Sequence, residues 1–204
     1  MRSSSLAGGV VLPVWALREY YWCPVSAFLA LSGWAPRATP SMAVGASSVP
    51  RGRLAELVGE RHVVEELLWE HPVESRRLGL RGRADLVALT AAGGPVVVEA
   101  KLSPVPRAAA RGRGLGAAVQ LAAYVVAVEE TLGAPVEASY IYSVEADRLV
   151  EVRVGPGLRR LVEHAAGELR EAVALGRPPA AVGAARGRRC RACGYRRGCP
   201  VARG

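Results

Sequence analysis

The sequence contains almost no lysine. Of its 27 basic residues only Lys101 is a lysine, and asparagine is absent altogether. Glutamine (Gln120), isoleucine and phenylalanine each occur once. This shortage of residues with A/T-rich codons indicates a G/C-rich genome, in which arginine serves wherever a solvated cation is sufficient. An ammonium is a compact charge whose pKa can shift toward that of a general base. We therefore expect Lys101 to have a role that arginine cannot fill.

Long hydrophobic runs are also missing. No segment approaches the roughly 18 uninterrupted apolar residues of a membrane span. Residues 6–17 are apolar enough to mimic a short signal sequence, but Pro13 interrupts them and Arg18 and Glu19 follow. No small-residue cleavage site comes next. The sequence therefore predicts a cytoplasmic protein without a membrane segment.

Cysteine is scarce and occurs at four positions, Cys23, Cys190, Cys193 and Cys199. Nothing in the sequence marks secretion, so a framework of disulfides is not the first interpretation. Disulfides of the kind found inside hyperthermophilic cells remain an alternative.

What the sequence has in excess is positive charge. It has 204 residues, half of them hydrophobic, and a formal net charge of +9. The length predicts one domain, residues 1–204. The charge favours a polyanionic partner, with nucleic acid first and an acidic membrane surface second. A generally arginine-rich surface is the alternative explanation.

Hydrophobic periodicity predicts an α/β domain with a central mixed sheet flanked by helices. We expect helices at residues 14–31, 54–71, 117–132 and 158–175. We expect strands within residues 73–90, broken near Gly79 or Gly82, and at residues 96–102, 138–144 and 148–154. Residues 177–204 form a tail with little apolar periodicity, which needs something other than a core to hold it.

Two carboxylates and the single lysine are predicted to meet at one sheet edge. Glu99 and Lys101 are two residues apart on a strand and therefore point to the same face. Asp85 ends the neighbouring predicted strand. Carboxylate oxygens suit Mg²⁺ or Mn²⁺, and such an ion can deprotonate a water for attack on a phosphate. The alternative is a simple salt bridge at the end of a strand.

The order of the motifs adds a resemblance. In sequence order the motifs are His62, Asp85, Glu99-Ala100-Lys101 and Gln120-x-x-x-Tyr124. This set resembles the RecB-type branch of the PD-(D/E)xK nucleases, including the G-x-x-H start of that branch. The resemblance implies a restriction-endonuclease-like core. It also implies a metal-binding set of His62, Asp85, Glu99 and Ala100, with Lys101, Asp85 and Glu99 as the catalytic residues. In this branch the lysine assists the attacking water, and Gln120 and Tyr124 line the DNA path. His71 and His164 lack such a context and are expected to be structural.

The cysteines form a one-plus-three pattern. Cys190, Cys193 and Cys199 make a C-x2-C-x5-C-P motif, and Cys23 lies far upstream. Four thiolates can hold a zinc ion or an iron–sulfur cluster. A one-plus-three set enclosing a RecB-like core resembles the CRISPR-associated exonucleases of the Cas-four family and the iron-staple nucleases of the AddB type. The small size and the Tyr20-Tyr-Trp-Cys-Pro24 run favour the Cas-four family. Val25 stands where that family often has a basic residue.

The resemblance implies a function as well as a cofactor. The four cysteines would ligate an iron–sulfur cluster, 4Fe-4S in preference to 2Fe-2S, and join the helix at residues 14–31 to the tail at 177–204. With Mg²⁺ or Mn²⁺, the protein would be a DNA exonuclease acting 5′ to 3′ on single strands. It would trim and select prespacers in CRISPR adaptation beside the integrase complex, and a homo-oligomer is compatible with this role.

Two arginine groups are expected to follow DNA phosphates. One lies in the loop before Gln120 and the other surrounds the tail cysteines; they comprise Arg107, Arg111, Arg113, Arg186, Arg188, Arg189, Arg191, Arg196 and Arg197. Two other functions remain open. One is a stand-alone RecB-like repair nuclease, and the other is a non-catalytic DNA-binding module stabilised by zinc.

Overall fold

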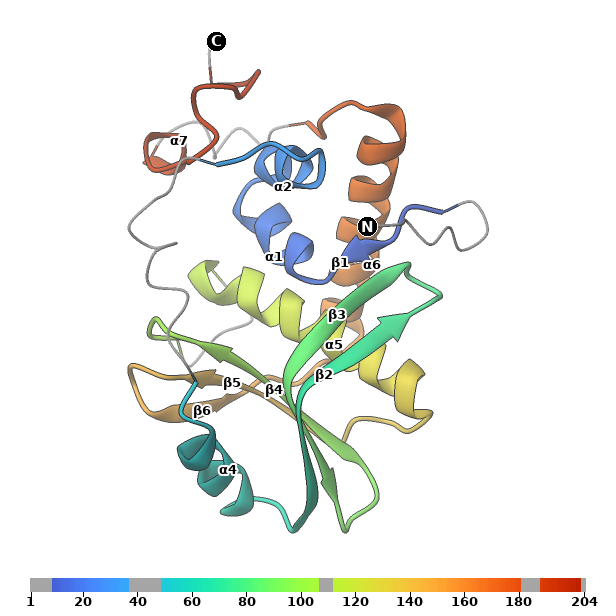
Figure 1. Cartoon of the computed structure of the whole chain (residues 1–204), viewed down its shortest axis with the longest axis vertical. Coiled ribbons are helices and arrows are strands. Elements are labelled where there is room, and N and C mark those ends of the chain that lie inside the picture. Colours follow the sequence, from blue (N-terminus) through green and yellow to red (C-terminus); the bar gives the residue numbers. More distant parts are fainter. Residues whose placement is uncertain (1–8, 37–48, 107–111, 181–187, 203–204) are drawn as a thin grey trace.

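A six-stranded mixed sheet organises the chain (Figure 1). The structure, a computed structural model, describes residues 9–36, 49–106, 112–180 and 188–202. In these residues the strand order is β1-β3-β4-β5-β6, and β2 pairs with β3. The strands are β1 (Leu12–Pro13), β2 (Val64–Ser75), β3 (Leu80–Thr90), β4 (Pro95–Lys101), β5 (Ala138–Ser143) and β6 (Arg148–Glu151). The predicted α/β class is therefore confirmed.

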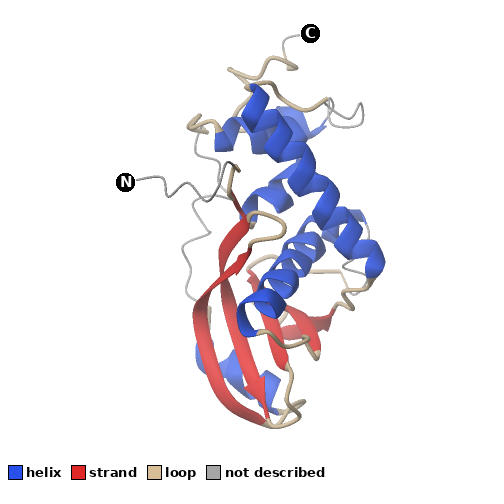
Figure 2. Cartoon of the chain, turned by 90° about the vertical axis from the view of Figure 1, so that its right-hand side faces the viewer, coloured by secondary structure: helices blue, strands red, loops and turns tan. Residues whose placement is uncertain are grey.

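Helices cover both faces of the sheet (Figure 2). They are α1 (Trp15–Trp22), α2 (Pro24–Leu31), α4 (Arg51–Gly59), α5 (Leu115–Leu132), α6 (Pro156–Leu175) and the short α7 (Arg188–Arg191). One core packs α5, α1 and α6 against one face, through side chains such as Val87, Val97 and Ile141. A second, smaller core packs α4 against the other face, through Leu86 and Val98.

Helix α5 is the one described helix long and apolar enough to cross a membrane. It connects the parallel neighbours β4 and β5 and is largely buried inside the fold. Its apolar composition is explained by this position at the centre of the larger core.

The helix expected at residues 54–71 is wrong in its second half. Helix α4 ends at Gly59, and residues from Val64 onward form β2. Strand β2 pairs with β3 along nearly its whole length. On it Leu67 faces the α4 core while Leu68 faces the α5 core. Pairing with a distant strand thus overrides a local pattern that also fitted a helix.

The helix expected at residues 14–31 is interrupted at Cys23. This residue has an extended backbone (φ −163°, ψ 117°) and separates α1 from α2. The next residue, Pro24, disfavours helical geometry in the residue before it and suits the first position of a new helix. The break places Cys23 at the junction of two helices rather than inside one.

The tail packs against apolar side chains, contrary to expectation. Tyr195, Cys199 and Val201 contact a small cluster that includes Val25 and Phe28 of α2. The ring of Trp34 lies directly over Gly198, where a Cβ would collide with it. Apolar contact therefore contributes to holding the described part of the tail.

Candidate active site and cysteine site

The last residues of β4 carry a buried ion pair. Lys101 Nζ donates to Glu99 Oε1 at 2.5 Å and to Oε1 of Gln120, on α5, at 2.8 Å. Both residues of the pair are largely buried. The expectation that Glu99 and Lys101 share a face is confirmed, and Gln120 holds the ammonium in place from the helix above.

Asp85 lies beside Glu99 in the middle of β3, and not at the end of its strand as expected. Leu86 pairs with Val98 in this antiparallel ladder, so the preceding residue on β3 faces the following residue on β4. Asp85 Oδ2 accepts a hydrogen bond from the backbone N–H of Ala100 at 2.7 Å. Ala100 itself has no side-chain donor atom, so it can offer an ion only its main chain.

Burial controls the charge of both carboxyls. It raises the pKa of Glu99 to about 7, with Lys101 opposing the rise and Asp85 adding to it. Burial also raises the pKa of Asp85, although the Ala100 hydrogen bond and Lys101 oppose the change. Glu99 is only 4% exposed, and its Oε2 has no hydrogen-bond partner among the described residues. An unsatisfied buried carboxylate oxygen beside a second carboxylate fits a divalent cation.

Gln120 and Tyr124 lie one turn apart on α5. Their side chains are only 5% and 6% exposed. Burial raises the pKa of the Tyr124 phenol, and the charges of Glu99 and Asp85 raise it further. Gln120 thus contacts Lys101, and Tyr124 lies near both carboxyls, while contact with DNA stays a prediction for these two residues.

The carboxylate–lysine group opens into a cavity of about 700 Å³. Asp85, Glu99 and Lys101 lie in its wall, together with loop residues 102–106. The remaining wall includes Arg18, Tyr21 and Trp22 of α1 and Arg189 of the tail. This α1 wall was not expected from the sequence. The available signal was the aromatic run ending at Trp22, immediately before Cys23.

His62 does not join the carboxylates. It lies in the turn between α4 and β2, where Nε2 is 2.9 Å from Tyr140 Oη and Nδ1 is 3.3 Å from Glu137 Oε1. The backbone N–H of Glu137 bonds to Pro95, at the start of β4. Glu99 is four residues further along that strand, roughly 13 Å away. The structure therefore does not bring His62 to Asp85 and Glu99: His62 lies with Tyr140 on the α4 side of the sheet, whereas Glu99 and Lys101 face α5, and its role as a metal ligand stays a prediction.

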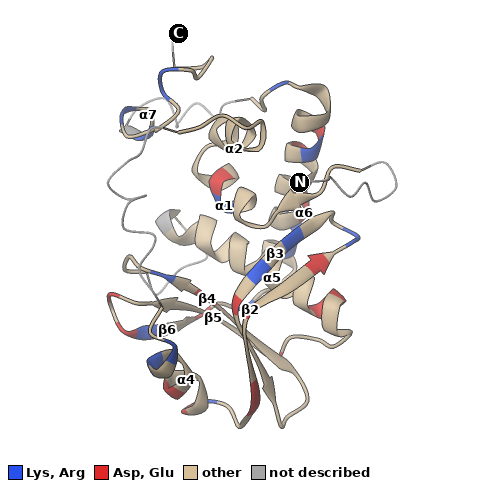
Figure 3. Cartoon of the chain, viewed as in Figure 1, with Lys and Arg blue, Asp and Glu red and all other residues tan. Residues whose placement is uncertain are grey.

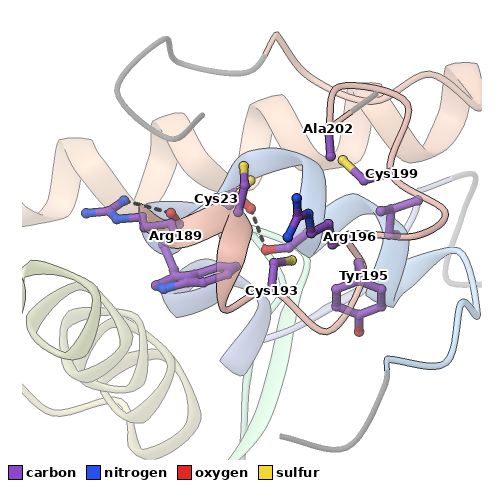
Figure 4. A pocket seen from close by; sticks show the side chains of 11 residues that line it. Cys23, Arg189, Cys193, Tyr195, Arg196, Cys199 and Ala202 are labelled. Atoms are coloured by element: carbon purple, nitrogen blue, oxygen red, sulfur yellow. Dashed lines mark hydrogen bonds between the residues drawn. The ribbon is translucent and has the colours of Figure 1, made fainter. Parts of the chain in front are cut away.

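The four cysteines line one cavity, between α2 and the tail (Figure 4). None of the four, all in described segments, forms a disulfide. Burial raises the pKa of Cys193, and the charges of the other three thiols raise it further. Among the described residues, no three His, Cys, Asp or Glu side chains converge tightly enough to hold a metal ion. The four cysteines nevertheless line a single cavity, as the one-plus-three pattern of the sequence predicts.

Arg189 connects the cysteine site to the larger cavity. Its Nη1 donates to the backbone oxygens of Trp22 at 2.7 Å and Tyr21 at 3.5 Å. Arg189 and Trp22 line both cavities. Each of these residues directly precedes a cysteine, Cys190 and Cys23. The tail thus supplies a wall of the cavity that contains Lys101.

Basic residues are distributed over β3, α4, α6 and the tail (Figure 3). The positive charge is therefore not confined to one element. Of the arginines expected to follow phosphates, Arg189, Arg191, Arg196 and Arg197 have described side chains. Arg107, Arg111 and Arg186, and the side chains of Arg113 and Arg188, lie outside the described part.

The chain is similar to known nucleases. The family model of the PD-(D/E)XK nuclease superfamily matches residues 16–200. A protein of Aeropyrum pernix named "CRISPR-associated exonuclease Cas4" is 36% identical over 192 residues, covering 92% of this chain and 94% of that protein. A protein of the same name from Thermoproteus tenax is 27% identical over 183 residues, covering 90% of each.

A solved structure described as "Crystal structure of SSO0001" covers 98% of this chain and 90% of its own, with 20% identity and a TM-score of 0.48.

Proposed function

Because the chain belongs to the PD-(D/E)XK nuclease superfamily, and within it to the CRISPR-associated Cas4 exonucleases, we propose that it is a divalent-metal-dependent DNA exonuclease. The observation that carries this proposal is the group of Asp85, Glu99 and Lys101 in one cavity, with Glu99 Oε2 buried and unsatisfied in the described structure. Mg²⁺ or Mn²⁺ suits these oxygen ligands.

Asp85 and Glu99 would hold the ion. When bound, such an ion lowers the pKa of a water and stabilises charge on a phosphate oxygen. Glu99 must lose its proton first, and Lys101 favours that loss through its ion pair. In the same cavity wall, the Lys101 ammonium would orient the attacking water or neutralise charge on the phosphate. Gln120 keeps the ammonium directed toward the cavity by its 2.8 Å hydrogen bond.

The substrate proposal is single-stranded DNA, cut 5′ to 3′. Support comes from the net charge of +9 and from the cavity wall, where Arg18 and Arg189 accompany Tyr21 and Trp22. Cations beside aromatic rings suit a single strand, because phosphates pair with the cations and unpaired bases stack on the rings. The proposed role is prespacer trimming in CRISPR adaptation, with the integrase complex as partner.

The cofactor proposal is a 4Fe-4S cluster ligated by Cys23, Cys190, Cys193 and Cys199. Support comes from the single cavity that all four thiols line. The cluster would join the α1–α2 junction to the tail within one nuclease domain. Purified protein should then contain iron and sulfide and absorb visible light. Stoichiometric zinc without iron would instead support the DNA-binding module.

The central experiment uses 5′- or 3′-blocked single- and double-stranded DNA with Mg²⁺, Mn²⁺ or EDTA. We expect cleavage of single strands from the 5′ end with either metal and none with EDTA. Asp85→Asn and Glu99→Gln should each abolish cleavage and weaken Mn²⁺ binding in calorimetry. Cleavage in EDTA, or unchanged Mn²⁺ affinity in both variants, would overturn the proposed site.

A further inference from the structure

Glu70 has an unusual backbone for a residue in the middle of a strand. Its φ is +48°, in the left-handed region, although it lies within the twelve residues of β2. The other described non-glycine residue with positive φ, Asp147, lies in the turn before β6. A left-handed residue that is neither glycine nor in a turn costs conformational energy, and such residues concentrate at functional sites.

The partner of Glu70 across the sheet is Asp85. Trp69 pairs with Leu86 and His71 pairs with Ala84, so the register on both sides places Glu70 opposite Asp85. Directly opposite residues of an antiparallel pair have side chains on the same face, and like charges in that position destabilise the sheet. The negative charge of Glu70 contributes to the raised pKa of Asp85. Glu70 therefore combines a strained backbone with a like charge opposite it, and both are unfavourable.

The ion pair of Glu70 does little to offset the strained backbone and the like charge of Asp85. Its carboxylate lies 3.8 Å from Arg51, and both side chains are more than half exposed. Arg51 also lies over the ring of Trp69. Exposed ion pairs of this kind contribute little to stability, so the contact with Arg51 does not explain the strained backbone.

A cation would explain both features. Glu70, Asp85 and Glu99 lie on the adjacent strands β2, β3 and β4, and the side chain of Glu99 is buried with one oxygen unsatisfied in the described structure. His62, the expected third ligand, lies with Tyr140 on the α4 side of the sheet, away from the face that carries Glu99. We propose that Glu70 is a carboxylate ligand of the divalent ion, and that its side chain moves from Arg51 to the ion on binding. This inference rests on the proposed function and adds a ligand to its metal site.

The test is Mn²⁺ affinity in Glu70→Gln, measured by calorimetry without DNA. Removing a ligand carboxylate should weaken binding at least about tenfold, the scale known for residues that tune metal sites. Glu66→Gln is the matched control, because Glu66 is an exposed residue of the same strand that pairs with Leu89, away from the site. It should bind Mn²⁺ as the wild type does.

A second variant separates function from folding. Asn tolerates the left-handed region better than Glu, so Glu70→Asn should raise the melting temperature of the metal-free protein while weakening Mn²⁺ binding. If both Glu70 variants bind Mn²⁺ within twofold of wild type while Asp85→Asn does not, this inference alone is overturned. If Asp85→Asn also binds normally, the metal site of the proposed function fails with it.

Discussion

Lys101 and Glu99 form a largely buried ion pair, and Gln120 is the second partner of the same ammonium. The lysine therefore serves the buried carboxylate as well as any reacting phosphate. Its removal would therefore affect both the charge of Glu99 and the chemistry of the cavity.

Lys101→Ala should cut DNA at less than a tenth of the wild-type rate, a barrier increase of at least about 1.4 kcal/mol. DNA affinity should be nearly unchanged, because one ammonium inside the cavity is a small part of the positive charge. Single-turnover cleavage and equilibrium binding measure the two effects. Lys101→Met, which fills the space without charge, should behave in the same way. A Met variant with wild-type activity would remove the lysine from the mechanism.

Metal-free stability should fall as the pH rises from about 5 to about 7.5. The pKa of Glu99 is raised from 4.5 to about 7 in the folded protein, so over this window the folded state binds a proton that the unfolded chain has released. Above about pH 7.5 the Glu99 carboxylate is charged although it lies in a buried site. Thermal melting in EDTA should show this trend in the wild type and a flatter one in Glu99→Gln. Parallel trends in the two proteins would refute the assignment to Glu99.

Mn²⁺ affinity should change in the opposite direction over the same pH window, because the ion needs the deprotonated carboxylate. Calorimetry in buffers of different ionisation enthalpy should detect proton release on binding near pH 6. Proton uptake, or an affinity that falls as the pH rises, would contradict Glu99 as a ligand.

Gly82→Ala should lower the free energy of unfolding by about 1–3 kcal/mol, the usual cost of overpacking a core. A Cβ at this position would lie 2.8 Å from Tyr124 Cε1 and 3.1 Å from Val14 Cγ2. Gly59→Ala, in α4, is the control. Nothing lies within 4 Å of its Cβ position, so this change should be neutral or stabilise the helix by up to about 1 kcal/mol. Denaturant unfolding measures both, and equal effects would contradict the packing at Gly82.

Cys23→Ser should lose iron, bleach the visible absorption and expose the tail to protease. Cys23 is the N-cap residue of α2, and serine is a favourable N-cap, so the helix itself should not suffer. The variant therefore tests ligation rather than folding. Iron and sulfide analysis of anaerobically purified protein provides the measurement. A full iron content with a protected tail would show that Cys23 is a buried thiol without a ligand role.

Local patterns predicted most elements but not the start of β2. Strong apolar periods identified α5 and α6, and the short apolar run around Val97 identified β4. The segment from Val64 to His71 had apolar residues compatible with both periods, and only its partner β3 decides in favour of a strand. The break at Cys23 could have been inferred from Pro24 alone, because a proline restricts the residue before it.

The grouping of Asp85, Glu99 and Lys101 was predictable from the sequence, while the surroundings of this group were not. Glu99 and Lys101 share a face because side chains alternate along a strand. Asp85 comes close to them because a tight turn folds its strand, β3, back against β4. His62 was placed by motif order, which carries no distance information. Glu70 has no motif, since its position opposite Asp85 depends on the register between two strands.

The link between Arg189 and the carbonyl of Trp22 spans 167 residues of sequence. A ribosome adding about 5–20 residues per second needs on the order of ten seconds or more to travel that distance. Helix α1 is complete when this interval begins, and β4, which carries Glu99 and Lys101, is synthesised within it, but the wall supplied by the tail follows only at its end. Asp85, Glu99 and Lys101 are therefore synthesised well before Arg189, and the part of the cavity wall that the tail supplies can form only late in synthesis.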